Sequence, residues 1–420
     1  MKDVKTVDYT EVYPKWKDEY KSTHKILIPD MLPWHFAIIE GVLRQLGYDA
    51  EILKNDSRMV IDEGLKHVHN DTCFPCLCVI GQHLDALKSG KYDVNKVAVL
   101  IPQSGGGCRA SNYVPLTRRA LKAEFPQVPV ISMNFVGLEK DSKIKFGVKG
   151  TFKLLYAVFY GDTIMWCYNQ TKPYEVEAGS ADFVRDEMIK MVIDLMAKNR
   201  YKNLKKINRD IITAFAAVKR RKEEKVKVGI VGEIYVKYAA LGNNNLEKFL
   251  LSEDCEPVVP TLMDFLLYFI VNNINDGKFY DKKGFFWYAN RFLYKVLYKM
   301  QKKVRKLFID EGSFEPIHDF EHLRECGDKI IFEGVKMGEG WLIGAEMAAL
   351  AENGVGNIVC TQPFGCLPNH VAGKGVIRTL KELYENENIV AVDYDPSATK
   401  VNQENRIKLM LATARENLGN

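Results

Sequence analysis

The chain lacks most of the features that mark secreted, membrane-spanning or nucleic-acid-binding proteins. Nine cysteines among 420 residues are too few for a disulfide-stapled scaffold. No apolar run approaches the roughly 18 residues of a membrane span, and the charged, aromatic start lacks the apolar core of a signal peptide. Lys and Arg outnumber Asp and Glu only by 59 to 54, with both signs interspersed, so a nucleic-acid partner is not expected. These absences predict a globular, cytoplasmic protein without a membrane partner.

The order of strand-like and helix-like segments predicts an α/β fold. From His24 onward, buried strands alternate with amphipathic helices in a βαβ rhythm, which favours mostly parallel sheets flanked by helices. From about Thr151 to Glu224 the strand pattern disappears, and it returns with the strand-like stretch Val226 to Val236. We therefore expect an N-terminal α/β lobe over 1–150, a helical connector over 151–225 and a C-terminal α/β lobe over 226–420.

The longest apolar stretch, Thr261 to Val271, contains an Asp and is followed by polar residues. It is therefore expected as a buried helix and not as a membrane span. Helices rich in Phe, Tyr and Leu are expected to fill the segment from Met263 to Phe308.

Four cysteines lie in short phrases punctuated by glycine and proline. Cys73 stands in NDTCFPC, Cys108 in QSGGGCRASNY, and Cys360 and Cys366 in CTQPFGCLPNH. Thiolates on irregular turns of this kind are typical of iron-sulfur proteins. Cys108 and Cys360 each follow a strand-like apolar run, so both thiols are expected at the carboxyl edge of a parallel sheet, where ligands bind in such folds.

Helices that follow these cysteines would support a negatively charged cluster. A helix starting at Arg109 or near His370 would aim backbone N–H groups at the same sheet edge. Arg109 itself either lowers the pKa of the Cys108 thiol, contacts an anionic substrate or is an ordinary surface residue. His370 is either a proton donor or, as we favour, the cap of the helix that follows.

Three consecutive glycines, Gly105, Gly106 and Gly107, precede Cys108. Glycines in a row are conformationally costly, so they are expected where φ is positive or where the backbone approaches a ligand too closely for a Cβ atom. The run lacks the spacing and the terminal Lys of a nucleotide-binding loop. It is therefore expected to admit the cofactor close to the backbone.

The phrase CFPC also allows other chemistry. Cys73 and Cys76 form a C-x-x-C step, which binds metals and also occurs in thioredoxin-like redox sites. Because no second C-x-x-C step follows, a structural zinc site explains the sequence less well than an iron-sulfur site. Cys78 lies in an apolar stretch and is expected in the core.

Together these phrases resemble those of the 2-hydroxyacyl-CoA dehydratase-like superfamily. The resemblance is carried by CFPC-x-x-VIGQ, QSGGGCRASNYV, VGEIYVKY, GEGWLIGAEM, QPFGCLPNHVAGKG and VDYDPSATKVNQENRIKLML. The chain is most similar to the branch found as the C-terminal part of large activase-related proteins of anaerobes and as stand-alone subunits. The likeness runs from about His24 to Leu411.

This resemblance implies a two-lobed subunit that holds an oxygen-sensitive cluster in the cleft between its lobes, as a homodimer or heteromer. It also implies a separate homodimeric activase, an iron-sulfur reductase that hydrolyses ATP to inject one low-potential electron. In the dehydratases, three thiolates hold a 4Fe-4S cluster with one iron open to an acyl-CoA substrate, which loses hydroxide through a ketyl radical. A related branch holds a double-cubane 8Fe-9S cluster with six thiolates and reduces small molecules.

Carried onto this chain, the family's recurrent cysteine phrases match Cys73, Cys108, Cys360 and Cys366, which we expect to be the metal ligands. Four thiolates would complete one cubane and would suit electron relay. Three would leave an iron open to substrate. The chain is thus expected to be either an enzyme of this kind or a non-catalytic relay or scaffold subunit.

A six-thiolate set would need further cysteines. Cys76 matches only some family members, and Cys326 lies in no phrase that aligns. With Cys76 in place, the sixth ligand would be Cys78, Cys255 or Cys326. The catalytic residues stay open, with Arg109, Asn112 and His370 as candidates.

Overall fold

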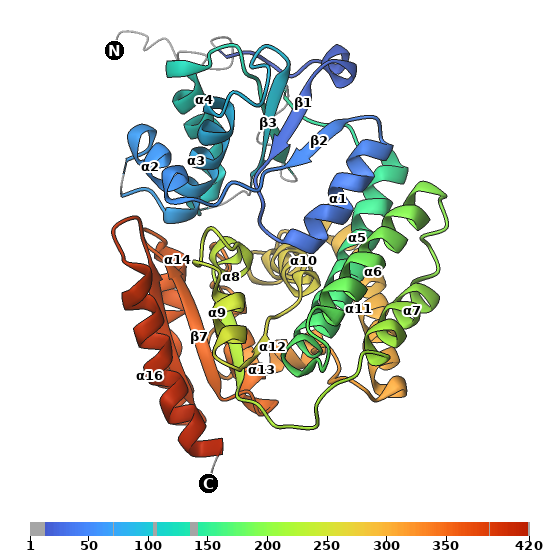
Figure 1. Ribbon diagram of the computed structural model, residues 1–420, viewed down its shortest axis with the longest axis vertical. Coiled ribbons are helices and arrows are strands. Elements are labelled where there is room, and N and C mark those ends of the chain that lie inside the picture. The colour runs from blue at the N-terminus through green and yellow to red at the C-terminus, as the bar shows by residue number, and fades with distance from the viewer. Residues whose placement is uncertain (1–12, 70, 104–106, 135–141, 386, 419–420) are drawn as a thin grey trace. The chain divides into compact units, whose positions relative to one another are not determined.

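The computed structural model describes residues 13–69, 71–103, 107–134, 142–385 and 387–418 (Figure 1). Contacts divide the chain into two compact units. Unit 1 comprises Met1–Asp30 and Leu43–Gly147, and unit 2 comprises Met31–Val42 and Val148–Asn420. The segment expected as a helical connector therefore belongs to unit 2, as does the first part of helix α1 (Pro33–Gln45).

Unit 1 contains a four-stranded parallel sheet with the order β2-β1-β3-β4. The strands are β1 (Lys25–Ile28), β2 (Asp49–Ile52), β3 (Val97–Gln103) and β4 (Val130–Asn134). The inner strands β1 and β3 are almost entirely buried, as their continuous apolar sequences require in a sheet covered on both faces. The strand order reverses between β1 and β3, which makes the carboxyl ends of these two strands the expected ligand position.

The helices of unit 1 pack closely on one another and on this sheet. They are α2 (Arg58–His67), α3 (Phe74–Lys88) and α4 (Tyr113–Glu124), with 3₁₀ turns η1 (Asp18–Ser22) and η2 (Arg109–Asn112). Helices α2 and α3 touch through Gly64 and Gly81, and a Cβ atom on Gly81 would lie 1.9 Å from the carbonyl oxygen of Val60. Only glycine permits this approach, so it fixes the position of α3 against α2.

Unit 2 repeats this plan with a second four-stranded parallel sheet, ordered β6-β5-β7-β8. Its strands are β5 (Lys227–Gly232), β6 (Glu256–Val258), β7 (Asn357–Pro363) and β8 (Asn388–Tyr394). Gly232 ends β5 with a φ of +144°, and a Cβ atom there would lie 2.1 Å from the carbonyl oxygen of Thr361. The order reverses between β5 and β7, so their carboxyl ends form the corresponding position in unit 2.

The chain from Gly147 onward contains twelve helices among its described residues. Helix α13 is almost completely buried and packs against β5 and α12, while α16 lies along β7 and β8 (Figure 1). The helices are α5 (Gly147–Asn169), α6 (Ser180–Ala197), α7 (Leu204–Ala216), α8 (Ile234–Tyr238), α9 (Leu246–Ser252), α10 (Leu262–Phe279), α11 (Phe285–Glu311), α12 (Phe320–Asp328), α13 (Trp341–Glu352), α14 (Leu367–Ala372), α15 (Ile377–Leu383) and α16 (Lys400–Leu418), with 3₁₀ turns η3 (Lys172–Tyr174) and η4 (Lys374–Val376).

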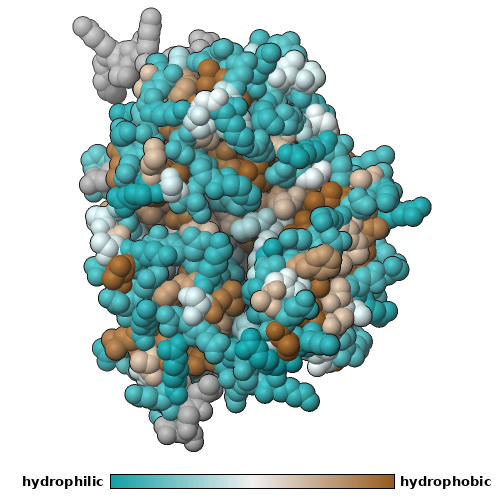
Figure 2. Space-filling model, viewed as in Figure 1, coloured by the Kyte–Doolittle hydropathy of each residue, from teal (hydrophilic) through white to brown (hydrophobic). Residues whose placement is uncertain are grey.

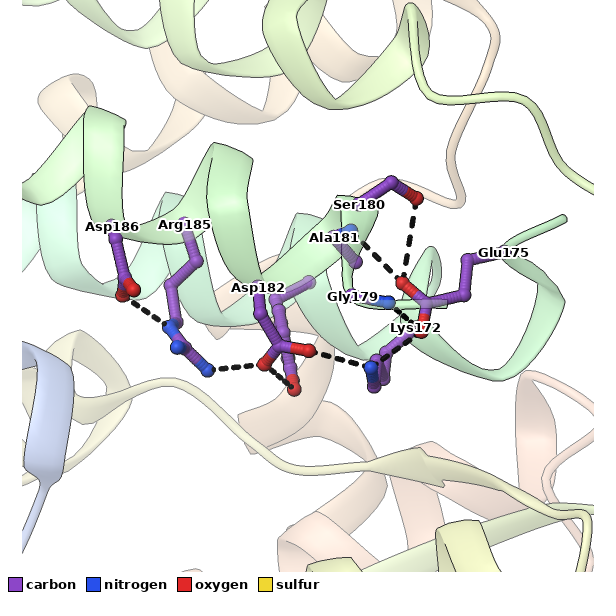
Figure 3. Close-up of polar contacts among 9 residues, drawn as sticks. Lys172, Glu175, Gly179, Ser180, Ala181, Asp182, Arg185 and Asp186 are labelled. Atoms are coloured by element: carbon purple, nitrogen blue, oxygen red, sulfur yellow. Dashed lines mark hydrogen bonds and ion pairs between the residues drawn. The ribbon is translucent and has the colours of Figure 1, made fainter. Parts of the chain in front are cut away.

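Buried carboxylates fix the starts of two of these helices. Glu175 accepts hydrogen bonds from the backbone N–H groups of Gly179 and Ala181 at the start of α6, and Lys172 joins it to Asp182 (Figure 3). Asp162 accepts from the backbone N–H groups of Leu262 and Met263 at 2.8 and 3.0 Å, which caps α10. Each carboxylate satisfies helix N–H groups that have no partner within the helix.

The expected fold class is confirmed, since both sheets are parallel and flanked by helices. The apolar stretch from Thr261 forms the buried helix α10, as expected. Within the described residues, no helix combines the length and the apolar character that crossing a bilayer demands. On the face shown in Figure 2, hydrophilic residues surround smaller hydrophobic patches.

Candidate functional site

Cys108 lies just beyond the carboxyl end of β3, where the sequence places it. It is half-buried and is the N-cap residue of η2, which leads directly into α4. The Ser111 hydroxyl donates to the Cys108 carbonyl at 2.7 Å, and Gln103 donates to the Ser111 carbonyl at 2.8 Å, so the turn is tied back to the end of β3. Of the three glycines, Gly105 and Gly106 lie outside the described residues, and Gly107 is exposed.

Cys73 lies at the same end of unit 1. It is buried, it is the N-cap residue of α3, and its Sγ atom lies 3.0 Å from the hydroxyl oxygen of Tyr113, the first residue of α4. Burial raises the pKa of the adjacent Cys76 thiol, the charge of Cys73 raises it further, and the nearby Arg109 guanidinium lowers it. The structure thus brings the CFPC phrase and the start of α4 together within unit 1.

Cys366 holds the corresponding position in unit 2. It follows the end of β7 and is the N-cap residue of α14, with its backbone N–H donating to Pro363. His370 is the fourth residue of α14, and its N–H donates to the Cys366 carbonyl at 3.1 Å. The expectation that His370 caps this helix is therefore wrong, because the helix begins earlier and Cys366 caps it.

Cys360 is placed differently from the expectation. Strand β7 continues to Pro363, so Cys360 lies inside the strand, paired with Val231 and Ala391, and does not emerge at the sheet edge. Its thiol is fully buried and accepts a hydrogen bond from the Gln362 amide at 2.9 Å. Burial raises the pKa of this thiol to about 12. Cys360 is thus an enclosed thiol that is hydrogen-bonded to the side chain of Gln362.

Cys73, Cys108 and Cys366 share a feature that Cys360 lacks: each is the N-cap residue of a helix or, for Cys108, of the 3₁₀ turn that leads into α4. Backbone N–H groups without helical partners point past an N-cap residue, and the helix dipole favours negative charge there. A thiolate at such a position is stabilised, as iron ligation requires. Each of these three positions, taken by itself, therefore suits a cluster thiolate better than the position of Cys360 does.

Cys255 and Cys326, two of the possible additional ligands, do not lie near Cys366. Cys326 lies on α12, with its Sγ atom 3.6 Å from His322 Nε2, which is 3.6 Å from Glu352 Oε2. Glu352 ends α13 and so stands before the start of β7, whereas Cys366 follows the end of that strand. Cys255, which directly precedes β6, also lies at the amino edge of the sheet. A seven-residue strand spans about 20 Å, which is too far for shared ligation.

The group of His322, Cys326 and Glu352 has potential metal ligands within 4.8 Å of one another. However, the Glu352 carboxylate already accepts from Lys329 at 2.5 Å and from the Tyr384 hydroxyl at 2.6 Å. These contacts hold the pKa of Glu352 low, at about 2. The group is thus an ion-paired cluster in its own right.

Two carboxyl groups that sequence reasoning did not single out lie at the carboxyl edge of unit 2. Glu233 directly follows β5 and accepts from the N–H of Val236 at 3.0 Å, while Glu339 accepts from the N–H of Ile234 at 3.1 Å. Burial raises the pKa of both groups, and the charge of Glu339 raises that of Glu233 further. A glutamate immediately after a strand-ending glycine was the sequence feature that could have indicated them.

Beside this pair lies a buried ion pair. Lys237 Nζ donates to both carboxylate oxygens of Glu346, at 2.9 and 3.2 Å, and neither side chain is more than 1% exposed. The loop that carries Glu339 also contacts the start of α14, since a Cβ atom on Gly338 would lie 3.1 Å from Pro368. Glu233, Glu339 and Cys366 therefore gather at one edge of the unit 2 sheet.

The remaining candidates on η2 are open to solvent. Arg109 and Asn112 are both exposed, and Asn112 precedes α4 without a side-chain capping bond. Both flank the turn that carries Cys108, so they are placed to contact a molecule that approaches it.

Comparisons with known proteins leave this arrangement to be interpreted from its own geometry. The chain matches no protein-family model, and no curated protein matches it.

Proposed function

We propose that this chain is an iron-sulfur protein of the 2-hydroxyacyl-CoA dehydratase-like type, with Cys73, Cys108 and Cys366 as ligands of one 4Fe-4S cluster. The observation that carries the proposal is the position of these residues, each of which is the N-cap residue of a helix or of a 3₁₀ turn. Two of them also follow the central strands β3 and β7 at the points where strand order reverses. When bound, such a cluster would supply a low-potential electron and, with three thiolates, one iron open to substrate.

The enclosure of Cys360 supports three ligands over four. Ligation by Cys360 would require the Gln362 amide to leave the thiol and the interior of β7 to open. Three thiolates favour direct action on a substrate, whereas four favour electron relay. The six thiolates of a double-cubane reductase are less well supported, because Cys255 and Cys326 lie at the opposite edge of the unit 2 sheet from Cys366 and Cys78 is fully buried within α3.

Carboxyl groups of the chain itself would supply the proton that a departing hydroxide needs. Glu339 is buried and Glu233 is half-buried beside the start of α8, and burial raises the pKa of both carboxyl groups. A carboxylic acid at this edge can protonate a departing hydroxide. The ion pair of Lys237 and Glu346 would keep this region charged, ordered and closed to water.

The partners follow from the resemblance. The electron donor would be a homodimeric, ATP-hydrolysing activase with its own iron-sulfur cluster, in an anaerobic cytoplasm. The substrate would be a small molecule or an acyl-CoA, and the exposed Arg109 near Cys108 would suit an anionic group on it.

Iron and acid-labile sulfide per chain, measured after anaerobic purification, test the proposal. We expect about four irons, the loss of nearly all of them in Cys366→Ala, and a wild-type content in Cys360→Ala. About eight irons would favour the double cubane, and loss of iron in both variants would favour the four-thiolate relay. A colourless protein that holds zinc would refute all three.

A further inference from the structure

Helix α11 extends beyond the core that anchors it. Its buried residues are Leu297, Gln301, Val304, Leu307 and Phe308, all from its thirteenth residue onward. The preceding three turns, residues 285–296, contain no buried residue, and Trp287 rests on α10 with its indole N–H donating to the Ile274 carbonyl at 3.0 Å. The sequence predicts a helix rich in Phe, Tyr and Leu here, but it does not indicate this exposure.

The exposed half of α11 is strongly apolar. Phe285, Phe286 and Phe292 are 81%, 79% and 71% exposed. Phe285, Phe292 and Val296 share one face of the helix by their spacing, with Phe286 and Leu293 beside them. Among the described residues, 22 large hydrophobic side chains are exposed, and seven of them lie between Tyr280 and Val296. Such a cluster of exposed apolar side chains indicates a binding surface for a partner that accepts apolar groups.

The same segment carries an unusual charge. Residues 278–306 contain ten Lys and Arg residues and a single acidic residue, Asp281. Because the whole chain carries +5, this stretch of net +9 leaves the rest of the protein net negative. Arg291, Lys295, Lys299 and Lys302 follow one another at helical spacing beside the apolar face, and none forms an ion pair with a described residue. A partner should therefore be anionic.

We propose that α11 from Phe285 to Lys302, with the turn before it, binds flat on an anionic phospholipid surface, with the phenylalanines inserted among the lipids and the basic row against their headgroups. An amphipathic helix with aromatic residues on one face and lysines beside it is typical of interfacial binding. Eight of the ten basic residues are Lys, which protein interfaces tend to exclude in favour of Arg. A second copy of the chain is disfavoured, because two segments of net +9 would repel each other.

This inference is independent of the proposed cluster. It departs from the expectation of no membrane partner, which was based on the lack of a long apolar run. A helix that lies in the plane of a bilayer surface needs no such run.

Flotation of the full-length protein with lipid vesicles tests the inference. We expect binding to vesicles of phosphatidylcholine mixed with phosphatidylglycerol, little binding to phosphatidylcholine alone, and weakening with salt. The triple variant Phe285→Ser/Phe286→Ser/Phe292→Ser should bind at least about tenfold more weakly. Lys295→Glu/Lys299→Glu/Lys302→Glu should lose the dependence on anionic lipid.

The matched control is Phe152→Ser/Phe183→Ser, which removes exposed phenylalanines elsewhere in unit 2 and should bind as wild type. Iron content should be unchanged in all variants, which separates this test from that of the cluster. Failure of the wild type to float with the vesicles would overturn the inference. This holds even if the same surface is found to bind an acidic protein. Equal binding by the phenylalanine variant and the wild type would also overturn it.

Discussion

The hydroxyl oxygen of Tyr113 lies 3.0 Å from the Sγ atom of Cys73, and the two residues mark the starts of α4 and α3. A contact between residues forty positions apart ties the CFPC phrase to the helix that follows Cys108. It also gives the proposed ligand sulfur a hydrogen-bonding neighbour, which is one of the means by which proteins tune iron-sulfur clusters.

Tyr113→Phe should leave the iron content intact and make the reduction potential of the cluster more negative. The reason is that a hydroxyl donating to a ligand sulfur stabilises the additional negative charge of the reduced state. Redox titration followed by visible absorption measures the shift. Tyr238→Phe is the control, since its hydroxyl donates to the Pro260 carbonyl at 2.7 Å within unit 2. An unchanged potential in Tyr113→Phe would show that the contact does not reach the cluster.

Gly232→Ala should lower the free energy of unfolding by more than about 3 kcal/mol, because the new Cβ atom meets the β7 backbone and φ is +144°. Gly312→Ala is the comparison, with a φ of +75° but no atom of a non-neighbouring described residue within 4 Å of the added Cβ atom. It should cost only about 1 kcal/mol. Chemical denaturation measures the free energy of unfolding of both variants. Equal decreases would mean that the close approach to Thr361 does not contribute to the cost.

Lys237→Met should destabilise the protein by about 3 to 5 kcal/mol, because it leaves the buried Glu346 carboxylate without its cation. Adding Glu346→Leu should restore most of this loss, since an apolar pair of similar volume fits the same space. The measurement is again chemical denaturation. A double variant less stable than Lys237→Met alone would contradict this view of the pair.

Asp264 links the stability of unit 2 to pH. Burial raises the pKa of this group from 3.8 to about 7, and the charges of Asp162 and Glu346 raise it, although Thr261 and Gln301 donate to it at 2.7 Å. The folded state therefore keeps a proton that the unfolded state releases, so its contribution to stability is complete below pH 4 and is lost as the pH rises toward 7.

Asp264→Asn should remove this dependence. Between pH 5 and 8, the wild type should lose on the order of 2 kcal/mol more stability than the variant. Denaturation at a series of pH values measures the difference, with the exposed Asp310→Asn as the control. Parallel profiles for Asp264→Asn and the wild type would contradict the assignment.

Local sequence patterns predicted which helices and strands form, but they did not predict where every strand ends or which residues are exposed. The run before Cys108 forms β3 because a strand buried on both faces must be continuously apolar, and this feature is visible in the sequence. The end of β7 was missed because Thr361, Gln362 and Pro363 have a loop-like composition, yet pairing with β8 extends the strand through them. Such extension depends on a neighbouring strand far along the chain.

The same limit applies to the site and to α11. Cys73 and Cys366 could be proposed as ligands from their phrases, but the placement of Glu233 near Glu339 depends on two loops more than a hundred residues apart. An amphipathic pattern on α11 indicates a face to be covered, and only the tertiary structure shows that the described chain leaves it open. Long-range contacts decide both features.

The central claim is that thiolates from distant parts of the chain bind one cluster. Iron per chain in Cys108→Ala and in Cys366→Ala, prepared anaerobically beside the wild type, tests it most directly. We predict about four irons in the wild type and almost none in either variant, because each removes a ligand of the same cluster. Wild-type iron in either variant would contradict the account.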